Sequence, residues 1–246
     1  MRWVSILFML FALAAAPRAE LAEESVDLAL VLLTDVSRSV DEAEYALIKK
    51  GYAAALTDAR VLAAIRGGAV GAVAFIYVEF AGSNEVRTLV DWTVVRDAAS
   101  AEAFAARITD VPRSAWGRTA ISSGIEHAMR ALASSGLEAQ RRVIDVCADG
   151  TNNSGRDVPT VRDEAVAAGL TINALVILSE PTNAWTAAHV QPPGGLTNYF
   201  RANVIGGIGA FAIEVEDFAS FGAALTRKLI NEIAGTTPDQ RFARNP

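Results

Sequence analysis

Hydrophobic and polar positions follow two alternating periods along the chain. Short apolar runs bounded by turn residues predict buried strands, and apolar positions repeating every three or four residues predict amphipathic helices. Because the strands and helices alternate, we expect an α/β fold: a doubly wound, mainly parallel sheet with helices on both faces. The predicted strands span about 26–34, 69–80, 86–95, 142–148, 171–178 and 210–215, and the predicted helices span about 41–59, 100–108, 121–132, 158–168 and 218–233.

Several element ends carry recognisable signals. Asp41 and Glu44 form the sequence pattern of a capping box at the start of the first helix. The second and third strands are joined by the short turn sequence 81–84, which predicts an antiparallel hairpin at one edge of the sheet. Gly169 is placed to end the fourth helix.

The first strand is followed directly by the sequence Asp35-Val36-Ser37-Arg38-Ser39. This D-x-S-x-S pattern places one carboxylate and two hydroxyls on a single turn, where alternate residues can converge on one point. All three are hard oxygen donors, which Mg²⁺ and Ca²⁺ require. Asp and Ser are also common in ordinary turns, so the pattern needs oxygen donors from elsewhere in the chain.

Two later segments supply such donors. Gly117-Arg118-Thr119 precedes a predicted helix, and Asp149 follows a second buried strand. A doubly wound sheet gathers such loops at the carboxyl ends of its strands, and Mg²⁺ coordinated there keeps room for an outside ligand. Alternatively, these side chains only cap helices and close turns. The candidate metal-binding residues are Asp35, Ser37, Ser39, Thr119 and Asp149.

The sequences DVSRS, GRT and ADG, in this order, resemble the metal-ion-dependent adhesion site of von Willebrand factor A domains. The resemblance covers roughly residues 25–234. More narrowly, the chain is similar to an uncharacterised branch of secreted bacterial A-domain proteins, a domain of unknown function. The narrower similarity is carried by TDVSRSVDEAEYALIKKGYAAAL, RRVIDVCADGTNNSG, VAAGLTINALVIL and VIGGIGAF.

The resemblance implies a Rossmann-like fold. It implies that Asp35, Ser37 and Ser39 form a first metal loop, Thr119 a second and Asp149 a third. Mg²⁺, or Mn²⁺ or Ca²⁺, is the implied cofactor. Two positions depart from the family pattern: Arg118 stands where a second Gly is common, and Ala120 where Pro is frequent. Arg118 either crowds the site or helps to hold an acidic partner.

Length and composition fit a single domain. The chain has 246 residues, of which 52% are hydrophobic and 20% charged. This balance supports a sizeable core and argues against disorder. We expect the domain to occupy residues 25–234 and a polar tail to occupy residues 235–246.

The amino terminus predicts a secretory signal peptide. Arg2 precedes an apolar run that is short for a membrane span, and small residues follow it. We expect a signal over residues 1–19, with cleavage between 16 and 22; the alternative is an uncleaved anchor. Removing residues 1–19 takes away two arginines and moves the formal charge from −6 to −8. An acidic, exported chain is a poor candidate for nucleic-acid binding.

Other chemistry-bearing residues give weaker signals. Cys147 stands alone within an apolar strand and predicts a buried, inert thiol. His127 and His189 lack partners at metal-ligand spacing, so solvated or capping roles are favoured. Asn152 or Asn153 either positions Asp149 by hydrogen bonding or belongs to an ordinary turn. No hydrolase nucleophile elbow or phosphate-binding loop is present in the sequence.

The sequence is compatible with three functions. The favoured one is a periplasmic or secreted protein-binding module, not an enzyme, in which the metal accepts Asp or Glu from an unidentified partner protein. The second is a metal-dependent hydrolase. Ser37 removes the second Asp that a D-x-D phosphatase needs. The third is a structural metal, with binding elsewhere on the surface.

Overall fold

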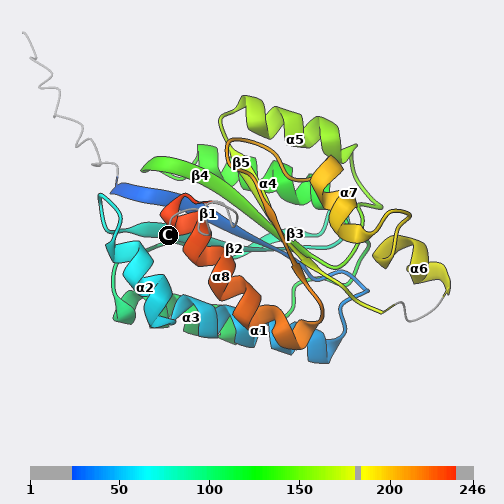
Figure 1. Cartoon of the computed structure of the whole chain (residues 1–246), viewed down its shortest axis with the longest axis horizontal. Helices are drawn as coiled ribbons and strands as arrows, with labels where there is room; N and C mark the ends of the chain where they lie inside the picture. Colours follow the sequence, from blue (N-terminus) through cyan, green and yellow to red (C-terminus); the bar gives the residue numbers. More distant parts are fainter. Residues whose placement is uncertain (1–23, 181–183, 237–246) are drawn as a thin grey trace, which may run out of the picture.

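A six-stranded sheet forms the centre of the protein (Figure 1). The structure, a computed structural model, describes residues 24–180 and 184–236. The strand order is β3-β2-β1-β4-β5-β6, with every neighbouring pair parallel except the antiparallel pair β2 and β3. The predicted α/β fold with one antiparallel edge hairpin is therefore confirmed. The strands are β1 (Glu24–Asp35), β2 (Val73–Phe80), β3 (Val86–Val95), β4 (Leu137–Ala148), β5 (Thr171–Ile177) and β6 (Ala212–Val215).

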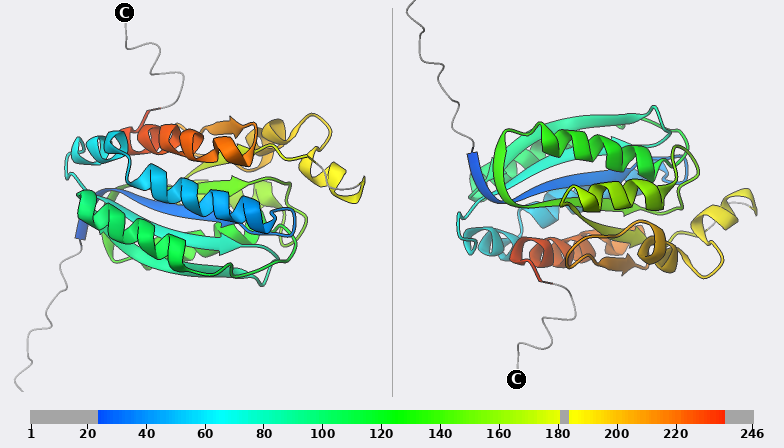
Figure 2. Two further views of the ribbon diagram at one scale, coloured as in Figure 1. Left: turned by 90° about the horizontal axis from the view of Figure 1, so that it is seen from below. Right: turned by 90° about the horizontal axis from the view of Figure 1, so that it is seen from above.

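Helices cover both faces of the sheet (Figure 2). One face carries α1 (Glu42–Leu56), α2 (Ala59–Arg66), α3 (Ala98–Asp110) and α8 (Phe221–Ala234). The other carries α4 (Ile121–Ala133), α5 (Val158–Ala167) and α7 (Leu196–Asn203). The short helix α6 (Ala184–Val190) projects beyond the carboxyl ends of the parallel strands.

The central strand β1 is buried on both faces. Leu28 and Leu30 face the core beneath α1, α2, α3 and α8, whereas Ala29 and Val31 face the core beneath α4, α5 and α7. Successive side chains of a strand point to opposite faces, so a strand between two helical layers must be apolar at almost every position. This explains the continuous apolar run before Asp35 and fixes that residue at the end of the strand.

Several local predictions differ from the structure. The predicted helix 41–59 is broken after Leu56, because the Asp58 side chain accepts the backbone N–H of Arg60 and starts a separate helix. The last helix is preceded by the 3₁₀ turn η1 (Phe218–Ser220). The sequence pattern did not predict α2, α6 or α7. On the surface of α4, Glu126 forms an ion pair with Arg156 at 2.7 Å.

Other predictions fall outside the described residues. These are the signal peptide at residues 1–19 and all but the first two residues of the tail. Among the described residues, no helix combines the length and apolar character needed to cross a bilayer.

Candidate metal centre

Three loops meet at the carboxyl ends of the central strands. The first follows β1 and carries Asp35, Ser37 and Ser39; the second precedes α4 and carries Thr119; the third follows β4 and carries Asp149. Since β1 and β4 are adjacent and parallel, both loops leave the sheet at the same edge. The second loop is tied to this edge by the Ala120 N–H, which donates to the Ala81 carbonyl at 2.7 Å.

Hydrogen bonds join the five predicted residues into one chain of contacts. The Ser37 N–H donates to Asp35 Oδ1 at 2.7 Å, and the Ser37 and Ser39 hydroxyls are 3.1 Å apart. Thr119 Oγ1 donates to Ser37 Oγ at 2.9 Å, and Ser39 Oγ donates to Asp149 Oδ1 at 2.7 Å. The structure therefore brings all five predicted side chains together, across up to 114 residues of sequence from the first to the last.

Both carboxylates of this cluster are buried, with Asp35 only 1% exposed and Asp149 fully covered. Burial and the nearby Asp149 charge raise the pKa of Asp35 well above its usual value. Burial also raises the pKa of Asp149 to about 6. Loss of hydration penalises the charged forms, and two like charges penalise each other. The site thus concentrates negative charge that a cation would neutralise.

The donor set fits a divalent cation. Asp35 Oδ2 is buried and accepts no hydrogen bond from any described residue, and neither carboxylate forms an ion pair within the described part of the chain. Two carboxylates and three hydroxyls are the hard ligands that Mg²⁺, Mn²⁺ and Ca²⁺ favour. The described residues hold no cluster of three or more His, Cys, Asp or Glu of metal-binding type, so the hydroxyls are needed to complete a site.

Arg113 fixes the backbone of the first loop. One guanidinium nitrogen, Nη2, lies 2.8 Å from each of the carbonyl oxygens of Val36, Ser37 and Val40, and Nε donates to the Ala115 carbonyl at 3.1 Å. The side chain is only 4% exposed. Because these carbonyls belong to the loop that carries Ser37 and Ser39, Arg113 holds the hydroxyls in place without contacting them.

Trp116 and Glu42 contact Arg113 in turn. Its guanidinium carbon lies 3.6 Å from the ring centroid of Trp116, a residue that remains half exposed, and its Nη1 lies 3.6 Å from Glu42 Oε1. Buried Glu79 accepts hydrogen bonds from Tyr45 Oη at 2.7 Å and from the Ser114 N–H at 2.9 Å. The segment leading to Thr119 and the loop after β1 are consequently one connected unit.

Small and amide residues shape the other two loops. Gly117 leaves room for the Glu85 carboxylate, since a Cβ at this position would lie 1.7 Å from Glu85 Oε2. Asn153 Oδ1 accepts the Thr119 N–H at 2.9 Å, and Asn152 Oδ1 accepts the Ser122 N–H at 3.1 Å. The two asparagines thus position the Thr119 loop; the suggestion that they bond Asp149 is wrong.

His189 is a site neighbour that the sequence did not reveal. Its Nε2 lies 3.1 Å from Thr119 Oγ1, and its Nδ1 lies 3.0 Å from Thr151 Oγ1. The ring lies against Gly150, where any Cβ would approach Nε2 to 2.2 Å. Burial lowers the pKa of His189, which favours the neutral ring. Because the Thr119 hydroxyl donates its proton to Ser37 Oγ, the neutral ring fits this site with its proton on Nε2, which donates to Thr119 Oγ1, while Nδ1 accepts from Thr151 Oγ1.

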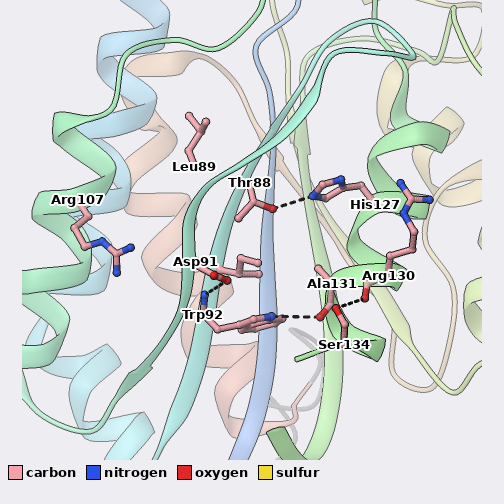
Figure 3. A pocket seen from close by; sticks show the side chains of 10 residues that line it. Thr88, Leu89, Asp91, Trp92, Arg107, His127, Arg130, Ala131 and Ser134 are labelled. Carbon is pink, nitrogen blue, oxygen red and sulfur yellow. Dashed lines mark hydrogen bonds between the residues drawn. The ribbon is translucent and has the colours of Figure 1, made fainter. Parts of the chain in front are cut away.

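The second histidine belongs to a different region. His127 Nε2 lies 2.8 Å from Thr88 Oγ1 in a hollow of about 630 Å³ between α4 and the edge strand β3 (Figure 3). Trp92 lines the same hollow and donates from Nε1 to the Ala131 carbonyl at 3.3 Å. None of the five candidate metal residues lines this hollow.

Comparison with solved structures defines the class of fold. A proximal thread matrix protein from the mussel byssus, in a structure with a zinc-occupied MIDAS motif, matches with a TM-score of 0.57 and 20% identity over 86% of this chain. The pilus adhesin SpaC of Lactobacillus rhamnosus GG matches with a TM-score of 0.58 and 13% identity over 85%. A von Willebrand factor type A protein from Catenulispora acidiphila matches with a TM-score of 0.53 and 16% identity over 85%. The chain spans 49%, 30% and 42% of these structures, respectively.

The fold is therefore that of a von Willebrand factor A domain. Residues 25–237 match the family described as "Protein of unknown function (DUF1194)", and the chain belongs to this family. No curated protein matches the chain in sequence.

Proposed function

We propose that this protein is an exported binding module that holds a divalent cation at the carboxyl edge of its sheet and captures an acidic group of a partner protein. The proposed metal residues are Asp35, Ser37, Ser39, Thr119 and Asp149. A signal peptide over residues 1–19 would direct the domain at 25–234 to the periplasm or the exterior.

One observation carries the metal site. Two buried carboxylates lie in one hydroxyl cluster, and one of their oxygens, Asp35 Oδ2, lacks any hydrogen-bond donor among the described residues. Buried polar atoms are normally paired, so an unpaired carboxylate oxygen beside a second carboxylate favours a cation ligand. The zinc named for the motif of the mussel protein supports the same interpretation.

The partner chemistry follows from the ligand preference of the cation. A divalent cation at this site offers an open coordination position for one more oxygen ligand. Asp35 and Asp149 already balance its charge, so the further ligand is chosen by donor type. A partner carboxylate is a hard oxygen donor and is therefore a suitable ligand. The adhesin among the structural relatives supports a binding role of this kind.

The metal is tested by isothermal titration of chelator-treated protein with Mg²⁺, Mn²⁺ and Ca²⁺. We expect saturable binding near one site per chain, lost in Asp35→Ala and retained in Asp91→Ala, which removes an exposed carboxylate on β3. Absence of saturable binding of all three metals would reject the site.

The acidic partner is tested separately with N-acetyl-glutamate amide, monitored by NMR. We expect the backbone signals of Ser39 and Thr119 to shift with this ligand when Mg²⁺ is present, but not in chelator. The uncharged N-acetyl-glutamine amide is the matched control. Metal binding without any response to the carboxylate would favour a structural metal and reject the capture of an acidic group.

A further inference from the structure

A groove of about 670 Å³ opens beside the candidate metal centre. It lies on the β5 and β6 side of the site, between the first turn of α1, the end of β5 and the segments before α7 and α8. Ser179 lines the groove, and its Oγ lies 3.4 Å from Asp149 Oδ2, which it can donate to. Glu44 also lines the groove, and its charge acts on Asp149. The groove and the metal centre are therefore neighbours.

The floor of the groove is apolar. Val190, Leu196 and Phe218 line it and are themselves almost fully buried, while Leu47 at its mouth is 39% exposed. Leu178, at the end of β5, continues the same surface towards Ser179. A floor of this kind can cover an apolar side chain or the methylene stem of a long basic one.

The rim of the groove is acidic. Four carboxylates line it, and no Lys, Arg or His lines it among the described residues; they are Glu44, Glu180, Glu216 and Asp217. Glu180 and Glu216 are exposed. Glu44 and Asp217 accept backbone N–H groups at helix starts, and the groove lining supplies no cation to any of the four carboxylates. Carboxylates around an apolar floor complement a side chain that has an apolar stem and a positive end.

The first two metal loops carry exposed arginines. Arg38 and Arg118 are both exposed, on loops joined by the Arg38 N–H, which donates to the Gly117 carbonyl at 3.1 Å. Acidic residues lie nearby as well, since Glu85 Oε2 accepts the Gly82 N–H at 3.0 Å. The arginines are therefore partly balanced, whereas the residues that line the groove include no cation.

We propose that the groove binds a Lys or Arg of the partner protein, next to the acidic residue that the metal captures. This inference rests on the proposed function and names its specificity: the partner carries a basic side chain close to the carboxylate that the metal captures. Segments with a further acidic residue in place of the basic one are disfavoured by the rim carboxylates. The groove therefore selects among the many carboxylates that a bare metal site would accept.

The experiment uses the full chain and fluorescent peptides measured by anisotropy at low ionic strength with Mg²⁺. Each peptide has blocked ends and a central Glu, followed by Leu and then Lys, Gln or Glu; a second set has the reverse order. We expect the Lys peptide to bind roughly threefold more tightly than the Gln peptide, the size of effect typical of an exposed ion pair, and the Glu peptide to bind more weakly. Added salt should reduce these differences.

Two double variants test whether the rim carboxylates of the groove cause the preference for the Lys peptide. Glu180→Gln with Glu216→Gln should remove the preference for Lys while leaving Mg²⁺ affinity unchanged. Glu102→Gln with Asp110→Asn, which neutralises two exposed carboxylates on α3, should keep it. Equal binding of all three peptides, with Mg²⁺ dependence retained, would overturn the groove and leave the proposed function standing. Absence of Mg²⁺-dependent binding for every peptide would overturn both proposals.

Discussion

Asp149→Asn provides a stringent test of the candidate metal centre, because it should make the metal-free protein more stable. Asn is nearly the same shape as Asp. Its oxygen can still accept from Ser39 Oγ, which bonds Asp149 Oδ1 at 2.7 Å, and its amide can donate to Ser179 Oγ. The substitution therefore removes a buried charge and leaves the packing and the hydrogen bonds in place.

The size of the effect follows from the pKa of Asp149. Burial raises this pKa from 3.8 to about 6, and each tenfold change in proton affinity corresponds to ~1.4 kcal/mol. At neutral pH the charged carboxyl should therefore cost the folded state up to about 3 kcal/mol. Below pH 3.8 the group is protonated in both the folded and unfolded states, so the cost is absent; it grows as pH rises and is complete above pH 6.

Urea denaturation in chelator, followed from pH 4 to pH 7, measures this cost. Wild type should lose stability relative to Asp149→Asn as pH rises. Adding Mg²⁺ at pH 7 should stabilise wild type, by ~2.7 kcal/mol when free metal exceeds its dissociation constant a hundredfold, and should leave the variant unchanged. A variant that is less stable than wild type in chelator at pH 7 would refute the argument that the site carries an uncompensated charge.

Three further substitutions test parts of the same framework by urea denaturation in chelator. Arg113→Met should lower the free energy of unfolding by about 3 kcal/mol, because it removes charge-assisted hydrogen bonds to the loop carbonyls. In a separate titration it should also weaken Mg²⁺ binding. Exposed Arg107→Met is the control, and equal stability of the two variants would contradict the role of Arg113. Lys228 forms ion pairs with buried Asp145 and Glu232. Lys228→Met should lower the free energy of unfolding by about 3–5 kcal/mol, because both carboxylates lose their shared cation. A loss below ~1 kcal/mol would argue against these ion pairs. Gly117→Ala should cost about 1–3 kcal/mol through its clash with Glu85, and truncating Glu85 in the same chain should recover part of the loss.

Much of the fold could be predicted because the strands obey a simple constraint. A strand between two helical layers must be apolar on both faces, so β1, β2 and the second half of β4 appear as continuous apolar runs. The elements that were missed are short or capped by single side chains. Asp58 starts α2 after only a brief interruption, and α7 is only 8 residues long, too short for its pattern to stand out in the sequence. Local hydrogen bonds, rather than hydrophobic pattern, decide these boundaries.

The five candidate ligands were identifiable because each stands at the end of a core element, where strand order alone brings loops together. The supporting residues were not. Arg113 acts on backbone carbonyls, which leave no side-chain pattern in the sequence, and its own segment is irregular. His189 reaches Thr119 across 70 residues from a short helix. Contacts of this kind depend on how loops pack, which a single sequence does not encode in any periodic form.

The reactivity of the Cys147 thiol can measure how often the folded domain opens. Cys147 is the single cysteine of the chain, and it lies on central strand β4 with 1% of its surface exposed. A thiol reagent can reach it only when the sheet separates from its helices, so the labelling rate measures how often the interior becomes accessible. Ligands that bind only the closed form would slow labelling, and the logarithm of the labelling rate would fall in proportion to the stabilisation free energy. Metals and partners can thus be screened on the protein without denaturant and without an engineered label.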